Sequence, residues 1–151
     1  GGTYSSTTLA ATANGAATAI VTAPLTLAPN TDMDFGKFTP GTGGTVNITA
    51  AGVASSTGAV VLTGGTPVPA TFDITGENTL TYSVSYGGGV LSDGTNTMAV
   101  APDDNNATLT TSGALQTFSV GATLTVGSGQ IAGSYSTAAP GSPFTVTVNY
   151  D

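Results

Sequence analysis

The side chains that could do chemistry in this chain are mostly acidic, and four of them form two close pairs. Asp32 and Asp34 are two residues apart, so in an extended segment they share a face, whereas Asp103 and Asp104 are adjacent in a turn-rich stretch. Two carboxylates can hydrolyse a glycoside as acid and base or nucleophile. The chain has no Trp to line a sugar-binding groove, and its Phe and Tyr residues mostly fall at positions predicted to be buried. We interpret the acids as solvated residues at strand ends and in loops.

Other catalytic systems lack their essential side chains. The chain has no His and no Cys, which excludes Ser–His and Cys–His nucleophile systems and Cys/His zinc sites. Lys37 is the one basic residue, and no Ser lies three positions before it to form a Ser–Lys pair. A Lys–Asn or Lys–Asp isopeptide bond, as in some surface proteins, would also depend on Lys37. We therefore expect no catalytic residues and no enzyme activity.

Calcium is the cation that the remaining oxygen ligands would suit. Residues 103–106 (Asp-Asp-Asn-Asn) offer hard oxygen ligands in one loop, and Asn30 precedes Asp32 and Asp34. Neither group has the spacing of a known calcium loop, and short runs of Asp and Asn are typical of turns. We predict Asx-rich turns, with no metal and no cofactor.

Charge and hydropathy limit the partners and the location. The formal net charge is −7, so the chain cannot neutralise phosphates, and we expect no nucleic-acid partner. No apolar run approaches the ~20 residues of a membrane-spanning helix, so no direct membrane insertion is expected. A composition rich in Thr, Gly and Asn and poor in Lys is common among secreted bacterial surface proteins. We expect an extracellular protein whose signal peptide has already been removed.

Period-2 alternation predicts an all-β fold. In the last strand Phe144, Val146, Val148 and Tyr150 fall on one face and polar residues on the other. Turn signals recur roughly every 8–12 residues, the spacing of a β-sandwich, and no stretch has helical periodicity. Strands are predicted at residues 21–27, 32–38, 45–50, 58–63, 70–75, 79–86, 97–101, 107–111, 115–126, 133–137 and 144–150.

Two segments lack an obvious partner within this single predicted domain. No segment of the given sequence follows the strand at 144–150, so we expect one of its edges to be open. Residues 1–20 form a weakly amphipathic extended segment, for which a disordered terminus is the alternative. The apolar phase of that segment comprises Leu9, Ala11, Ala13, Ala17 and Ala19.

Several short motifs along residues 20–151 resemble motifs of secreted bacterial pilin-like domains. The N-terminal motifs are Asp34-Phe35-Gly36-Lys37-Phe38 and Gly44-Thr45-Val46-Asn47-Ile48-Thr49. The C-terminal ones are Ala132-Gly133-Ser134-Tyr135 and the final strand ending at Tyr150. This order is similar to that of the spore-coat-protein-U-like subunits of archaic chaperone–usher pili and of a related Gly/Thr/Ala-rich domain family of unknown function.

The resemblance implies an incomplete immunoglobulin-like β-sandwich, completed by a donor strand from a neighbouring subunit. Residues 1–20 would be the donor extension and residues 21–151 the pilin domain. The protein would be a subunit of a cell-surface filament, a pilus or fimbria, in a head-to-tail homopolymer of identical subunits. In such families a periplasmic chaperone and an outer-membrane usher assist assembly. The expected acceptor groove comprises Val21, Ala23, Leu25, Leu27, Phe144, Val146, Val148 and Tyr150.

Two other functions and one other arrangement remain open from sequence. A stand-alone adhesin or carbohydrate-binding module would need exposed aromatics, for which Tyr4, Tyr86 and Tyr135 are the candidates. A surface-layer or matrix protein would use the Asp-rich loops to bind Ca²⁺. Residues 1–20 could also fold back into the groove of their own domain.

Overall fold

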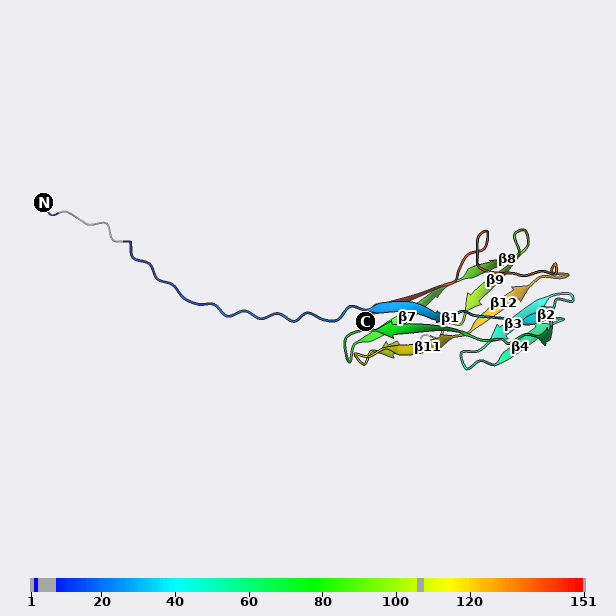
Figure 1. Ribbon diagram of the computed structural model, residues 1–151, viewed down its shortest axis with the longest axis horizontal. Helices are drawn as coiled ribbons and strands as arrows, with labels where there is room; N and C mark the ends of the chain where they lie inside the picture. The colour runs from blue at the N-terminus through cyan, green and yellow to red at the C-terminus, as the bar shows by residue number, and fades with distance from the viewer. Residues whose placement is uncertain (1, 3–7, 106–107, 151) are drawn as a thin grey trace.

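The computed structural model describes residues 2, 8–105 and 108–150, and within these ranges it contains strands and no helix (Figure 1). The strands are β1 (Thr26–Thr31), β2 (Lys37–Thr39), β3 (Gly44–Ile48), β4 (Ala54–Gly58), β5 (Val61–Gly64), β6 (Ala70–Thr75), β7 (Thr81–Gly87), β8 (Gly89–Ser92), β9 (Thr97–Pro102), β10 (Thr108–Thr110), β11 (Gln116–Val120), β12 (Ala122–Val126) and β13 (Thr145–Tyr150). The all-β prediction is confirmed. The described residues form no helix that could span a membrane.

The strands pair in four antiparallel groups. The largest has the order β4-β3-β12-β9-β8, two three-stranded sheets have the orders β1-β6-β11 and β10-β7-β13, and β2 pairs with β5. The two three-stranded sheets face each other at one end of the domain, where Ile74 of β6, Tyr82 of β7 and Phe118 of β11 line a cavity of about 80 Å³. In this arrangement β1 and β13 are both edge strands.

Gly121 is the point at which the chain changes sheets. Strand β11 pairs with β6, whereas β12, which follows directly, pairs with β3 and β9. A Cβ atom at position 121 would lie 2.4 Å from the carbonyl oxygen of Ile48 and 2.9 Å from the amide nitrogen of Ala50. Only glycine allows the two backbones to come this close, and this contact lets β11 and β12 serve different layers.

The hydrophobic core lies under the five-stranded sheet. Val46 and Ile48 of β3 and Leu124 of β12 are fully buried, in accordance with the period-2 alternation of their strands. The outer face of the same strands carries hydroxyl and amide groups that bond to each other. Thr123 Oγ1 donates to Asn47 Oδ1 at 2.8 Å, which lies beside it on β3. The Thr- and Asn-rich surface therefore satisfies its polar groups without charged residues.

The structure corrects several predicted strand limits. The first strand begins at Thr26 rather than at position 21, because the Ala23 N–H bonds to a side chain and Pro24 has no N–H for a ladder. The strand predicted at 133–137 is only an isolated bridge at Ser136. Strands β4 and β8 were not predicted, since their sequences, ASSTG and GVLS, lack a clear apolar alternation.

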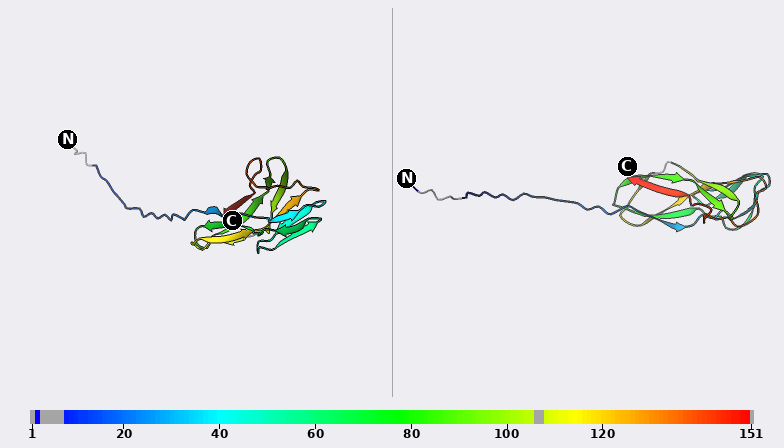
Figure 2. Two further views of the ribbon diagram at one scale, coloured as in Figure 1. Left: turned by 45° about the vertical axis from the view of Figure 1, so that its right-hand side comes forward. Right: turned by 90° about the horizontal axis from the view of Figure 1, so that it is seen from above.

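Residues 8–25 lie outside every strand, and all but the last few of them extend away from the domain (Figures 1 and 2). We call residues 8–24 the extension. Its large apolar side chains are almost fully exposed: Leu9 by 91%, Ile20 by 90% and Val21 by 95%. The extension leaves the same end of the domain at which β13 ends (Figure 2). Such exposure is unfavourable in water, so these side chains are available to another surface.

Candidate functional site

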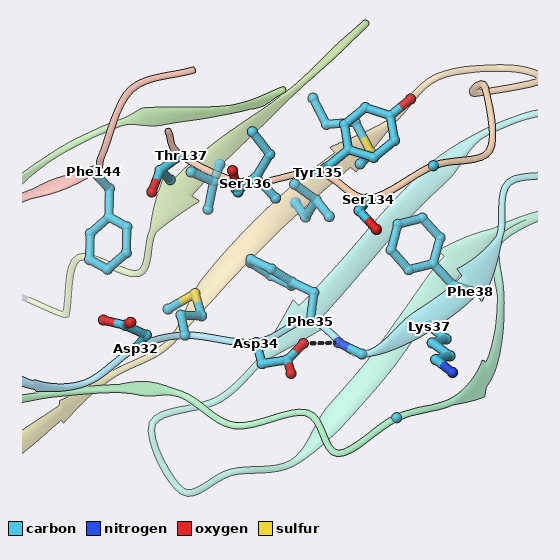
Figure 3. Close-up of a pocket in the computed structure, with 18 of the residues that line it drawn as sticks. Asp32, Asp34, Phe35, Lys37, Phe38, Ser134, Tyr135, Ser136, Thr137 and Phe144 are labelled. Atoms are coloured by element: carbon cyan, nitrogen blue, oxygen red, sulfur yellow. Dashed lines mark hydrogen bonds between the residues drawn. The ribbon is translucent and has the colours of Figure 1, made fainter. Parts of the chain in front are cut away.

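The described residues form an apolar groove of about 1100 Å³ (Figure 3). One wall is the segment 31–40, which runs from the end of β1 through β2, and the other comprises residues 131–137 with Pro143 and Phe144. Between the walls the groove reaches the interior of the sandwich, where it is lined by Ala70, Phe72, Leu91, Met98, Val100 and Leu124. The groove therefore opens one side of the core to solvent.

The first wall offers an unpaired backbone edge. Asp34 exchanges two backbone hydrogen bonds with Val68, at 3.0 and 2.9 Å, so its N–H and C=O point away from the groove. Successive residues of an extended chain point these groups to opposite sides. The N–H and C=O groups of Met33 and Phe35 therefore face the groove, and within the described residues they have no backbone partner. The side chain of Phe35 is buried in the core, which fixes this wall in place.

A turn at Gly36 divides the first wall. Its N–H donates to Asp34 Oδ1 at 2.8 Å, and its φ of +75° lies in the left-handed region that favours glycine. A Cβ there would lie 2.8 Å from the carbonyl oxygen of Gly64. The Asp34-Phe35-Gly36 sequence thus places a buried aromatic ring between an acid that caps the turn and the glycine that makes it.

The second wall is a strap, residues 131–137, held at both ends. Gln130 Nε2 donates to the carbonyl oxygen of Thr97 at 3.2 Å and to Tyr135 Oη at 3.1 Å, and the Tyr135 hydroxyl donates to the Ile131 carbonyl at 2.6 Å. At the other end Ser136 exchanges backbone hydrogen bonds of 2.8 and 3.0 Å with Ser92 of β8. Between these ties, the backbone groups of residues 132–134 make no hydrogen bond with any described residue.

Aromatic rings connect the groove to both layers. Phe72 of β6 stacks on Phe118 of β11 with 5.8 Å between ring centroids. Its edge meets Phe144, which precedes β13, at 6.2 Å and an angle of 82°. Edge-to-face contacts of this kind are favourable beyond simple burial. Phe144 is thus held against β6 while its strand pairs with β7 in the other layer.

The groove has charged groups only at its rim. Asp32, Asp34 and Lys37 are exposed there, while Ser134 and Ser136 lie on the opposite side (Figure 3). Within the described part of the chain, no group of three or more acidic residues is close enough to hold a metal ion. The groove therefore has the chemistry of an apolar binding surface with two hydrogen-bonding borders.

Comparison with known proteins places most of the chain in one family. The family model described as domain of unknown function (DUF4402) matches residues 25–150. The chain belongs to the DUF4402 family. No curated protein and no solved structure matches it. The matched region of this DUF4402 domain contains both walls of the groove, and the extension lies outside it.

Of the predicted acceptor residues, only Phe144 lines the groove of the DUF4402 domain. Leu25, Leu27, Val146 and Val148 are half-buried at the end where β1 and β13 pair with β6 and β7. The remaining three are exposed: Val21 and Ala23 in the segment before β1, and Tyr150, whose ring meets Tyr82 edge-on at 6.5 Å. The predicted donor residues are all exposed in the extension: Leu9, Ala11, Ala13, Ala17 and Ala19.

Sequence reasoning missed most of the groove. Met33 and Phe35 were predicted within a strand, but not as a wall. Met98 and Leu124, which line the interior of the groove, come from β9 and β12. The sequence does not show that these two strands are neighbours in a sheet. One local signal was available for the strap: Tyr135 is an isolated aromatic in a run of small residues, a position at which a ring commonly anchors a loop.

Proposed function

We propose that this protein is the repeating subunit of an extracellular filament, in which the extension of one copy fills the groove of the next. In this proposal the domain is an immunoglobulin-like β-sandwich that lacks one strand, and the neighbour supplies it. The observation that carries the proposal is the groove itself, an opening into the core bordered by two backbone edges without partners. The resemblance to pilin-like domains supports it.

A strand is the occupant that suits this groove best. The free N–H and C=O groups of Met33 and Phe35 on one side, and of residues 132–134 on the other, require a partner that carries its own main-chain donors and acceptors. The apolar interior requires side chains at every second position. An added β-strand supplies both the main-chain hydrogen-bonding groups and the alternating apolar side chains. A compact small molecule would not supply them along the whole length of the groove.

The extension has the required length and pattern. The wall from Asp32 to Phe38 is at most about 23 Å long, because of its turn at Gly36, whereas residues 8–24 reach roughly 55 Å. The groove would therefore hold at most about seven residues, and the rest of the extension would connect two domains. Its odd-numbered positions from Leu9 to Val21 are all apolar or Gly, and the even-numbered ones include most of its Thr residues. We assign the odd phase to the interior of the groove.

The direction in which the extension leaves the domain favours a linear array. The extension leaves one end of the domain, and β1 and the first wall run from there toward the other end (Figures 1 and 2). In a head-to-tail row the inserted strand would run parallel to the first wall and antiparallel to β13. Such a contact joins two different surfaces and does not close on itself, so repetition gives a filament.

No observation favours the alternative functions. Tyr135, one of the aromatics considered for sugar binding, uses its hydroxyl to hold the strap, and Tyr86 is half-buried. Tyr4 and Asn106 lie outside the described residues. A carbohydrate-binding module and a calcium-dependent matrix protein are therefore not proposed.

Lys37 provides a direct test of filament formation. It is the only Lys or Arg in the chain, so trypsin can cut only after this residue, which lies on β2 at the groove wall. We expect electron microscopy of protein isolated from its native source to show thin, unbranched fibres. In a trypsin digestion of these fibres, the chain should resist cleavage after Lys37. A variant lacking residues 1–24 should stay monomeric and be cleaved after Lys37. Monodisperse monomers of the full chain, cut as fast as the truncated variant, would refute the proposal.

A further inference from the structure

The point where the extension joins the domain is fixed by a specific contact. The N–H of Ala23 donates to Glu77 Oε2 at 2.6 Å. Two residues later, Leu25 packs on the turn that carries Glu77: a Cβ on Gly76 would lie 3.2 Å from Leu25 Cδ1. Pro24, between them, has a fixed φ and restricts Ala23 to an extended conformation. The base of the extension is thereby held straight in the outward direction seen in Figure 1.

The turn that carries Glu77 is itself anchored. Thr111 is 1% exposed, and its hydroxyl donates to the carbonyl oxygen of Glu77. The N–H of Thr79 donates to the carbonyl oxygen of Thr111 at 2.7 Å, and the N–H of Thr111 donates to that of Leu80 at 2.9 Å. Because a buried residue ties the turn from β6 to β7 at several points, the Glu77 carboxylate has a stable base from which to hold Ala23.

An outward direction matters because each domain carries both partners of the proposed contact. The domain's own groove begins at Pro29, four residues after Leu25. If the extension turned back, its tip could reach that groove and run antiparallel to the first wall. A tethered segment has an effective concentration of the order of millimolar. Self-insertion would therefore compete strongly with insertion into a neighbour at the usual micromolar concentrations.

We propose that Glu77 is a positioning residue that directs the extension away from its own groove and thereby favours insertion into a second copy of this chain. The inference rests on the proposed function and deepens it, because it identifies what selects the neighbour's groove over the domain's own. The carboxylate acts by accepting the Ala23 N–H, a charge-assisted hydrogen bond that a chain turning back at this point would break.

Single-molecule energy transfer on isolated monomers can test this role directly. The sequence contains no Cys, so Thr12→Cys in the extension and Thr95→Cys in the turn between β8 and β9 allow two specific dyes. In the parent chain we expect a dominant low-transfer population, the outward extension. Glu77→Ala should raise the high-transfer population roughly threefold, the effect of one partly exposed hydrogen bond. Glu77→Gln retains an acceptor oxygen but loses the charge, so it should raise this population less than Glu77→Ala does.

The outcomes separate this inference from the proposed function. Equal transfer distributions in the parent and in Glu77→Ala would overturn it, even if the parent forms filaments. A rise in Glu77→Gln as large as in Glu77→Ala would also overturn it, because the effect would then come from charge and not from the hydrogen bond. Failure of the full chain to form filaments refutes the proposed function instead, and the measurement on monomers does not depend on that result.

Discussion

Replacing Leu9 with alanine tests whether the start of the extension is the donor that enters the groove. Leu9 is 91% exposed in the single chain and belongs to the odd phase that we assign to the groove. The extension lies outside the folded domain, so this substitution should not change the free energy of unfolding of the domain. Any effect on assembly therefore reports the contact between subunits.

The magnitude follows from the carbon atoms removed. Leucine has three more carbon atoms than alanine, and each buried CH₂ contributes about 0.8 kcal/mol, so Leu9→Ala should weaken the contact by about 2.4 kcal/mol. At 25 °C this corresponds to a roughly 50-fold increase in the dissociation constant. Ile20→Ala is the matched control, because it also removes three carbons from a side chain that is 90% exposed, but from the opposite phase.

Sedimentation of assembled protein across a dilution series would measure the critical concentration of each variant. We expect a roughly 50-fold rise for Leu9→Ala and less than about a twofold change for Ile20→Ala. A large effect of Ile20→Ala with none of Leu9→Ala would refute the placement of Leu9 in the groove, because the groove holds about seven residues and these two lie eleven positions apart. No effect of either substitution would refute insertion of either end of the extension.

Three further predictions concern the domain itself. The Tyr82 hydroxyl is buried and has no hydrogen-bond partner among the described residues, so Tyr82→Phe should stabilise the domain by about 1 kcal/mol in urea unfolding, and a loss of that size would contradict the reasoning. Hydrogen bonds, first from Asn30, lower the pKa of Asp73, so the stability it contributes is present above the ordinary pKa of 3.8 and is lost as the pH falls through the lowered value. The Tm of Asp73→Asn should therefore decline less than that of the parent chain below about pH 4, and parallel declines would exclude this role. Gly121→Ala would place a methyl group 2.4 Å from the Ile48 carbonyl and should destabilise the domain by about 3 kcal/mol; an unchanged urea midpoint would show that the two backbones can separate.

The local pattern of the sequence predicted the fold class well. The run ATFDIT was predicted as a strand at 70–75, and β6 has those limits. The final strand was predicted from its alternation, and β13 begins within one residue of that position. Period-2 alternation is a property of neighbouring residues, so it can be read without knowing which strands pair.

The position of the groove could not be predicted in this way. The sequence predicted an acceptor groove along residues 21–27 and 144–150, whereas the groove of the structure lies at residues 31–40 and 131–137 and shares only Phe144 with that prediction. Its interior combines Phe72, Met98 and Leu124, which come from three strands and lie at least 25 positions apart in the sequence. Their proximity depends on β12 pairing with β9 and on the sheet change at Gly121. These are non-local pairings that no local period encodes.

The extension illustrates the division between sequence and tertiary structure. Composition and alternation by themselves determined that residues near the start of the chain are extended, uncharged and apolar on one face, because these are properties of consecutive side chains. Only the tertiary structure decided where that segment points and what it could enter. The Glu77 contact with Ala23 joins residues 54 positions apart, and the groove walls are separated by about 100, so both exist only once the sheets have paired.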